Sequence, residues 1–246
     1  MSGAVRPGLN SRLLYGLLAD RVVTTCQMAA TRIQQQSGAL CRSIPTGLDP
    51  QTIVFDSKER DRFRQLCKPG GLLVGSACFM RSWKGIDDFL HAAHELRHRE
   101  EIRWMLIGGG HVATYKKKAD ELGLEGIVHF TGHLENPYPA LAALDIFVLA
   151  STAHEGVSQA ILQAAYLEKP LIATATGGLQ EVCIPSLTGI RVDPFSPSQI
   201  ASSVLSLQKD PALRDILGKN GRQLVEERFS FEKMLDQMEA VFESVL

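Results

Sequence analysis

The sequence has almost no excess charge of either sign. Its 26 lysines and arginines nearly balance its 27 aspartates and glutamates, which leaves a formal net charge of -1. A protein that binds nucleic acid through its overall field carries a large positive excess. We therefore expect no nucleic-acid partner, although a local basic patch that binds phosphate stays compatible with this balance.

Cysteines are few, and long apolar runs are missing. The five cysteines are widely spaced and form no C-x-x-C pair, so we expect neither a disulfide framework nor a metal site, and we expect a cytoplasmic protein. The best apolar run, Leu141–Ala150, contains Asp145 and is too short to cross a bilayer. The opening letters MSGAVRPGLNSR have no apolar h-region, so we expect no signal peptide.

What the sequence does contain, from residue 72 onward, is an alternation of short apolar runs and longer helical patterns. Continuous apolar runs are typical of strands buried on both faces of a parallel sheet, and their alternation with helices indicates βαβ units. We predict an α/β fold with a doubly wound, mostly parallel, Rossmann-like sheet. The predicted strands are Leu72–Ser76, Arg103–Ile107, Ile127–Phe130, Ile146–Ala150, Leu171–Thr174 and, more weakly, Gly189–Val192. The predicted helices are Ile86–Arg99, Val112–Leu122, Tyr138–Leu144, Val157–Leu167, Leu179–Cys183, Ser198–Gln208, Ala212–Glu227 and Phe231–Val245.

Residues 1–50 have a different pattern, with one predicted strand, Arg21–Thr25, between two predicted helices, Arg12–Leu18 and Met28–Gln36. So few elements cannot bury a core of their own. We therefore interpret residues 1–50 as the remnant of a preceding domain with its linker. Residues 51–229 then form a ligand-binding domain, and residues 230–246 form a terminal crossover helix.

One candidate site lies around Glu155, between a predicted strand and the helix Val157–Leu167. The amino end of a helix at the carboxyl edge of a sheet suits a diphosphate, and Glu155 could accept hydrogen bonds from sugar hydroxyls. Gln163 follows eight residues later, a rise of roughly 12 Å if all eight are helical, which is comparable to the span from hexose to ribose. Alternatively, Glu155 only complements the helix dipole and Gln163 is a solvated polar residue.

Two further loops lie at the same predicted edge. Gly177-Gly178 follows a strand and permits close backbone approach to a ligand, although a structural turn explains the pair equally well. Arg81 and Lys84 lie between a strand and a helix, where two cations could neutralise a diphosphate without a metal. The alternative for Arg81 and Lys84 is a solvated loop.

Two glycine motifs complete the set. Gly108-Gly109-Gly110 resembles a dinucleotide fingerprint, but the third glycine of G-x-G-x-x-G is missing, so it indicates a nicotinamide enzyme only weakly. Phe130-Thr131-Gly132-His133 closes a strand and could present backbone groups to a nucleobase.

Together and in this order, these motifs resemble the donor-binding domain of glycosyltransferase family 4, the retaining enzymes with the GT-B fold. Similar segments near the amino end match the family's domain-crossing region. The matching segments are Arg81 with Lys84-Gly85, Gly108-Gly109-Gly110, Phe130-Thr131-Gly132, Glu155-Gly156, Gln163-Ala164, Lys169-Pro170-Leu171-Ile172-Ala173-Thr174, Gly177-Gly178-Leu179-Gln180-Glu181, Glu227-Arg228-Phe229-Ser230, Ala19-Asp20-Arg21-Val22-Val23-Thr24-Thr25 and Ile44-Pro45-Thr46-Gly47-Leu48-Asp49.

The resemblance implies transfer of a sugar from a nucleotide-diphosphate donor to a glycan or lipid-linked acceptor, with retention and without a metal or other cofactor. Arg81 and Lys84 would stabilise the departing diphosphate and Glu155 would orient the sugar, so these three are the expected catalytic residues. The expected donor-binding residues are Gly109, Gly132, His133, Gly156, Val157, Ser158, Gln163, Gly177, Gly178 and Glu181.

The sequence departs from the family pattern in three ways. Gln163 replaces a glutamate, Arg81 lies three rather than five residues before Lys84, and a family-type amino-terminal domain is expected before residue 1. That domain would hold the acceptor site and would place the protein at the cytoplasmic face of the membrane. We therefore expect little transfer by this chain alone. The alternatives are a non-catalytic binding fragment that needs a separate amino-terminal half, and a nucleotide-sugar epimerase.

Overall fold

The computed structural model describes residues 9–245, with side chains from residue 13 onward. The expectation that no signal peptide opens the chain concerns residues that lie largely outside this range. No helix in the described part of the chain combines the length and the apolar character that a membrane span requires.

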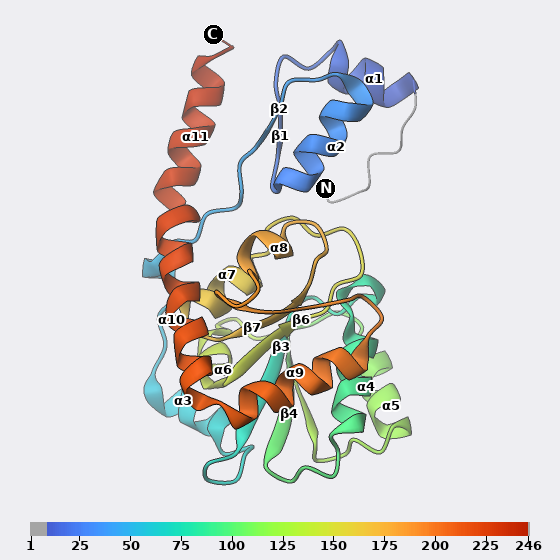
Figure 1. Ribbon diagram of the computed structural model, residues 1–246, viewed down its shortest axis with the longest axis vertical. Helices are drawn as coiled ribbons and strands as arrows, with labels where there is room; N and C mark the ends of the chain where they lie inside the picture. Colours follow the sequence, from blue (N-terminus) through green and yellow to red (C-terminus); the bar gives the residue numbers. More distant parts are fainter. Residues whose placement is uncertain (1–8, 246) are drawn as a thin grey trace.

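One parallel sheet forms the centre of the molecule (Figure 1). Its strands run in the order β5-β4-β3-β6-β7-β8, and every neighbouring pair is parallel. All positions of β3, β6 and β7 are buried, which is why their sequences are continuous apolar runs. The strands are β3 (Leu72–Ala77), β4 (Ile102–Ile107), β5 (Val128–Gly132), β6 (Ile146–Leu149), β7 (Leu171–Thr174) and β8 (Gly189–Val192).

Helices cover both faces of this sheet, so the predicted doubly wound α/β fold is confirmed. Leu73 and Phe147 belong to one core cluster, whereas Val74 and Trp104 belong to the other, because successive strand residues point to opposite faces. The second cluster contains α4 (Ile86–Glu95), α5 (Val112–Glu121) and α9 (Pro197–Lys209). The first cluster contains α6 (Tyr138–Ala143), α7 (Gln159–Tyr166) and α8 (Leu179–Val182), and α10 (Pro211–Arg228) contributes to both.

The sequence pattern missed helix α3 (Ser57–Arg64). Its eight residues contain a single apolar side chain, Phe63, so the sequence has no amphipathic pattern that would predict a helix there. Its stability comes instead from polar contacts at both ends. The Asp56 carboxylate accepts a hydrogen bond from the Lys58 amide at 2.9 Å, which caps the amino end, and Arg64 donates to Asp145 at 2.5 Å.

Residues 9–43 form a separate small unit above the carboxyl edge of the sheet (Figure 1). It contains α1 (Leu9–Gly16), β1 (Val22–Thr24), α2 (Gln27–Ser37) and β2 (Cys41–Ser43), and β1 pairs with β2 in parallel. The predicted strand Arg21–Thr25 is confirmed as β1, but the second strand, β2, was not predicted. The short, largely polar segment of β2 lacks an apolar pattern, so only its pairing with β1 identifies it as a strand.

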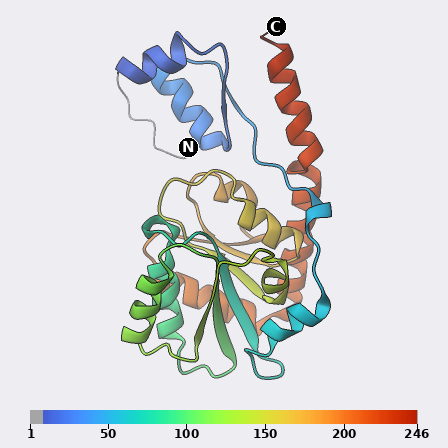
Figure 2. The same cartoon turned by 180° about the vertical axis from the view of Figure 1, so that it is seen from behind.

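Two neighbouring segments of chain leave the sheet domain on the side of the small unit, and the first of them joins the two parts (Figure 2). One passes through a short turn, η1 (Pro50–Thr52), and the other leads into α11 (Phe231–Glu243). Leu48 and Ser230 form a parallel bridge between them. No residue of α11 is buried, and its apolar side chain Phe242 is 60% exposed.

Candidate functional site at the carboxyl edge of the sheet

The centre of the sheet contains a topological switch point. Strands β3 and β6 are neighbours, but the chain continues from β3 to α4 on one face and from β6 to α7 on the other. Open α/β sheets bind ligands where their connections diverge in this way. We call the two loops that leave these strands, residues 78–84 and 150–158, the switch loops.

An ion pair joins the two switch loops. Lys84 Nζ lies 2.6 Å from Glu155 Oε1, and the side chains are only 18% and 6% exposed. Ser151 Oγ donates a second hydrogen bond to the same carboxylate oxygen, at 2.7 Å. Two of the three predicted catalytic residues are therefore in direct contact. Ser151, which the sequence analysis did not single out, is the first residue after the apolar run of β6 with a polar side chain, and that position is the signal that could have found it.

Two glycines permit the close approach of these loops. Gly85 has φ 69°, and a Cβ there would lie 1.9 Å from the carbonyl oxygen of Ala150. Gly177 has φ 56°, and a Cβ there would lie 1.8 Å from the carbonyl oxygen of Glu155. Any side chain at either position would push a switch loop away. The glycines of the Lys84-Gly85 and Gly177-Gly178 motifs are thus required by the packing around Glu155.

The backbone of the second switch loop is also held by hydrogen bonds. The Gly178 amide donates to the Glu155 carbonyl at 3.1 Å, and the Val157 amide donates to the Thr25 carbonyl at 3.0 Å. Gly156 lies against Thr25 as well, since a Cβ on the glycine would meet Thr25 Oγ1 at 2.1 Å. The amides of Gly178 and Val157 are thus already engaged within the chain.

Glu181 forms a second contact between the sheet domain and the small unit. Its Oε1 accepts a hydrogen bond from the Gln27 amide at 2.8 Å, at the start of α2, where no side chain of the helix itself provides a cap. Burial raises the pKa of the Glu181 carboxyl, and the hydrogen bond from Gln27 acts in the opposite direction. A carboxylate at the amino end of a helix is favourable, so Glu181 helps to seat α2.

The remaining glycine motifs meet at the same edge, further along the sheet. The Gly108 amide donates to the Gly132 carbonyl at 3.1 Å, and the Met80 amide donates to the Gly109 carbonyl at 2.8 Å. A Cβ on Gly109 would lie 3.5 Å from the Cβ of His133. The structure therefore brings Gly109, Gly132 and His133 together, beside the first switch loop.

Arg81 is held differently from Lys84. Its guanidinium carbon lies 4.9 Å from the ring centre of Phe79 and 5.2 Å from that of Trp83. The Trp83 ring in turn meets His154 edge-on, with ring centres 6.1 Å apart. Stacking on two aromatic rings holds a cation at the edge without neutralising it. No sequence pattern indicates a role for Phe79 or Trp83, because the stacking of Arg81 on their rings depends on the short turn η2 (Ser82–Lys84).

Gln163 lies half-buried in the second turn of α7. The helix begins at Gln159, with Ser158 at its N-cap position, two residues later than predicted. The predicted rise of 12 Å between Glu155 and Gln163 is therefore wrong, because only the part of that segment from Gln159 onward is helical.

The thiols near the site are poor nucleophiles. Burial raises the pKa of Cys78 to about 12, with Lys84 opposing the shift, and burial also raises the pKa of Cys26, whose Sγ lies 3.8 Å from the Glu155 carbonyl. Thiols act as nucleophiles only when ionised. In the described part of the chain, no cluster of three or more His, Cys, Asp or Glu side chains is arranged to hold a metal ion.

Comparisons with known proteins give this arrangement a context. Residues 57–224 match the family model described as glycosyl transferases group 1. Alpha-D-kanosaminyltransferase from Streptomyces kanamyceticus is 26% identical over 98% of this chain and 62% of its own length. N-acetyl-alpha-D-glucosaminyl L-malate synthase from Bacillus anthracis is 26% identical over 98% of this chain and 64% of its own length. The chain spans less than two thirds of the length of these two relatives, and half the length of an archaeal glycosyltransferase from Methanocaldococcus jannaschii that it also matches.

Solved structures confirm the fold. The crystal structure of Anabaena HepE in complex with UDP-glucose superposes with a TM-score of 0.85 at 22% identity, and the match covers 96% of this chain and 67% of HepE. A glycosyltransferase from Rickettsia africae superposes with a TM-score of 0.87 at 18% identity, over 99% of this chain and 69% of that one. Identities this low support a shared GT-B architecture and nothing finer.

Proposed function

Because the chain belongs to the glycosyl transferases group 1 family, we propose that it binds a sugar nucleotide at the switch loops and provides the donor-binding part of a retaining glycosyltransferase. The observation that carries this proposal is the Lys84–Glu155 pair at the switch point. It places a cation for a diphosphate beside a carboxylate for sugar hydroxyls, which are the two groups that a sugar nucleotide presents at its reacting bond.

In the proposed reaction, the bond between the anomeric carbon and the diphosphate oxygen breaks, and a bond forms between that carbon and an acceptor hydroxyl oxygen, whose proton passes to the diphosphate. Negative charge accumulates on the departing diphosphate. Lys84 and Arg81 would stabilise that charge. Arg81 is suited to this role because its aromatic stack leaves its charge available. Glu155 would accept hydrogen bonds from the sugar and fix its orientation. No residue in this account requires a metal ion.

Other predicted donor contacts are constrained by the bonds that these residues already make. Because the Gly178 amide is bonded to Glu155, the Gly177 amide is the better placed of the two to reach a sugar or phosphate. We propose that Gln163 holds the ribose and that the loop of Gly132 and His133 faces the base. The anionic donor would lie below the small unit, so the acceptor, a glycan or a lipid-linked glycan, would approach between that unit and the sheet edge.

Isothermal titration calorimetry with UDP, GDP, ADP and their sugar conjugates tests the donor part of this proposal. We expect at least one nucleotide to bind with unchanged affinity in the presence of EDTA. Lys84→Met should weaken that binding about tenfold or more, since it removes a charge-assisted hydrogen bond to phosphate, whereas Gln163→Glu should be tolerated. Strictly metal-dependent binding, or no binding by any nucleotide, would overturn the proposal.

Analysis of the reaction products tests the chemistry. Incubation of the sugar nucleotide with candidate acceptors and a second protein that supplies an acceptor domain should give a glycoside with the anomeric configuration of the donor, whereas the chain alone should transfer little. Recovery of an epimerised nucleotide sugar would identify an epimerase instead. Tight binding with neither product, even after addition of a second protein that supplies an acceptor domain, would identify a binding module.

A further inference from the structure

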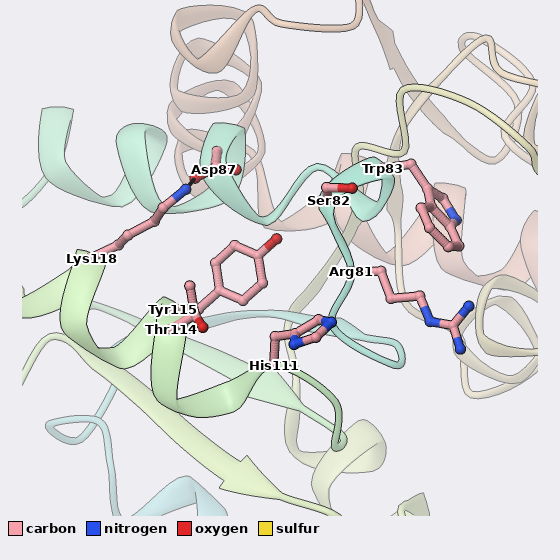
Figure 3. A pocket seen from close by; sticks show the side chains of 8 residues that line it. All are labelled: Arg81, Ser82, Trp83, Asp87, His111, Thr114, Tyr115 and Lys118. Carbon is pink, nitrogen blue, oxygen red and sulfur yellow. Dashed lines mark hydrogen bonds and ion pairs between the residues drawn. The ribbon is translucent and has the colours of Figure 1, made fainter.

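A second cavity lies beside the switch loops, between the amino ends of α4 and α5 (Figure 3). Its volume is about 500 Å³, within the range of small-molecule sites. None of the predicted donor-binding residues lines it, and of the predicted catalytic residues only Arg81 does. The lining residues are Arg81, Ser82, Trp83, Asp87, His111, Thr114, Tyr115 and Lys118.

Tyr115 is the clearest sign that this cavity is built for a ligand. The residue is only 5% exposed, and its ring packs in the core cluster on the α4 face of the sheet. Its hydroxyl points into the cavity (Figure 3), and no hydrogen-bond partner for it exists among residues 9–245. The buried polar side-chain atoms without a partner in the described residues are Ser43 Oγ and Trp104 Nε1, so the Tyr115 oxygen is not enclosed and reaches the open space of the cavity. The cavity therefore presents a fixed polar group to whatever enters it.

The charges around the cavity favour an anion. Lys118 Nζ and Asp87 Oδ1 pair at 2.5 Å, so these two charges cancel. Arg81 forms no ion pair within the described part of the chain and supplies a net positive charge. The amino end of α5 adds to it. The hydrogen-bond ladder of that helix begins where the Tyr115 amide donates to the His111 carbonyl, at 3.3 Å, and the Val112 amide is already bonded to the Gly110 carbonyl, at 2.8 Å. The amides of residues 113 and 114 are the ones left to bind an anion.

The rest of the lining favours hydroxyl groups and a ring. The Asp87 carboxylate, whose charge is balanced by Lys118, accepts hydrogen bonds from hydroxyls. Ser82 and Thr114 add two groups that both donate and accept. The Trp83 indole lies at one end of the cavity, beside the Arg81 guanidinium that stacks over its ring at 5.2 Å (Figure 3). A molecule that satisfies this set carries one anionic group on a polyhydroxylated ring.

We propose that the cavity is a second ligand site, and that it binds a phosphorylated sugar. Its phosphate lies between Arg81 and the amino end of α5, its hydroxyls bond Tyr115 and Asp87, and its ring lies against Trp83. This site is distinct from the donor site at Lys84 and Glu155, and it does not depend on the function proposed for those residues. Since Arg81 lies at the edge shared by the two sites, a ligand bound at one site changes the affinity of the other site for its own ligand.

The test uses glucose 6-phosphate as the probe and tryptophan fluorescence as the readout. Trp83 lines the cavity, whereas Trp104, the other tryptophan of the chain, is fully buried in the core. We expect glucose 6-phosphate to change the emission saturably. Tyr115→Phe should weaken its affinity about fivefold, as expected for one lost hydrogen bond. Tyr138→Phe is the matched control, because that hydroxyl lies 3.4 Å from Thr52 Oγ1, in another part of the molecule.

Three results would overturn the proposal. The first is no saturable change with glucose 6-phosphate at millimolar concentration. The second is an equal effect of Tyr115→Phe and Tyr138→Phe. The third takes one of two forms. Inorganic phosphate alone could give the full fluorescence response, which would indicate a bare anion site. Gln163→Ala could abolish the response to glucose 6-phosphate, which would indicate that the probe enters the donor site. Failure of UDP to bind while glucose 6-phosphate binds would refute only the function proposed above.

Discussion

The ion pair between Lys84 and Glu155 offers a quantitative test of how the site is built. The charged atoms are 2.6 Å apart, and the side chains are 18% and 6% exposed. At an effective dielectric constant of about 20, two unit charges this close attract by about 6 kcal/mol. Desolvation of both groups offsets most of that attraction, whereas removal of one partner leaves the other buried without compensation, at a cost of about 3 kcal/mol.

We expect Lys84→Met and Glu155→Gln each to lower the free energy of unfolding by about 2–3 kcal/mol. The amide of Glu155→Gln can still accept the hydrogen bond from Ser151, so this variant isolates the effect of charge. The double variant should cost little more than either single one, which gives a coupling energy of about 2 kcal/mol. Urea unfolding of the four proteins, followed by circular dichroism, measures each of these quantities.

The pair between Arg222 and Glu168 provides a matched control. Its charged atoms are 3.5 Å apart, and the side chains are 42% and 45% exposed, so the same cycle with Arg222→Met and Glu168→Gln should give less than about 1 kcal/mol of coupling. Additive effects at Lys84 and Glu155, or equal coupling in both cycles, would refute the argument that burial makes the switch-loop pair a unit.

Three further outcomes are expected. Glu155→Ala should weaken binding of the sugar nucleotide about tenfold or more in calorimetry, because it removes hydrogen bonds to the sugar, whereas Glu168→Ala at the far end of α7 should leave binding unchanged; equal effects would reduce Glu155 to a helix-dipole role. Gly177→Ala places a Cβ 1.8 Å from a carbonyl oxygen, whereas Gly70 also has positive φ but a Cβ there would meet nothing within 4 Å. Urea unfolding should therefore show a larger loss for Gly177→Ala, about 2–3 kcal/mol, than for Gly70→Ala, about 1 kcal/mol, and equal losses would contradict the steric argument. Burial lowers the pKa of Lys169 from 10.5 to about 8; between about pH 8 and 9 the unfolded chain then holds the proton that the folded chain releases, so the amine adds about 1 kcal/mol of stability over that interval. Burial raises the pKa of the cysteines, which lowers stability as the pH rises, in the wild type and in Lys169→Met alike. The quantity to measure is therefore the free energy of unfolding of the wild type minus that of Lys169→Met. A difference that does not grow from pH 8 to 9 would refute the assignment.

Much of the sheet domain could be predicted from the sequence. Strands of a parallel sheet that are buried on both faces are largely apolar, so runs such as Leu171–Thr174 can be recognised in the sequence. Residues that follow such strands share one edge, which places Lys84 and Glu155 in the same region. Their direct contact could not be predicted, because it depends on β3 lying next to β6, and periodicity does not determine strand order.

Other features depend on contacts that no local pattern reveals. Helix α3 is stabilised by an aspartate cap and by Arg64, rather than by an apolar stripe. The contact between Glu181 and the start of α2 joins residues that are 154 positions apart. The stack of Arg81 on two rings follows from the conformation of one short turn. In each case the decisive partner is distant in sequence or is placed by backbone geometry.

The connection between the small unit and the sheet domain is fixed to the start of α11, which limits how these two parts can move. The Leu48 amide donates to the Phe229 carbonyl at 2.7 Å, and the Phe231 amide donates to the Leu48 carbonyl at 3.0 Å. Gly47 fits against the start of α11, where a Cβ would lie 2.7 Å from the Cα of Phe231. The single crossing that leads to the small unit is therefore fixed to the start of α11, and a rotation of the unit would centre on this point. Since Thr25 lies in the small unit and bonds to Val157, such a rotation would pull directly on the loop that carries Glu155.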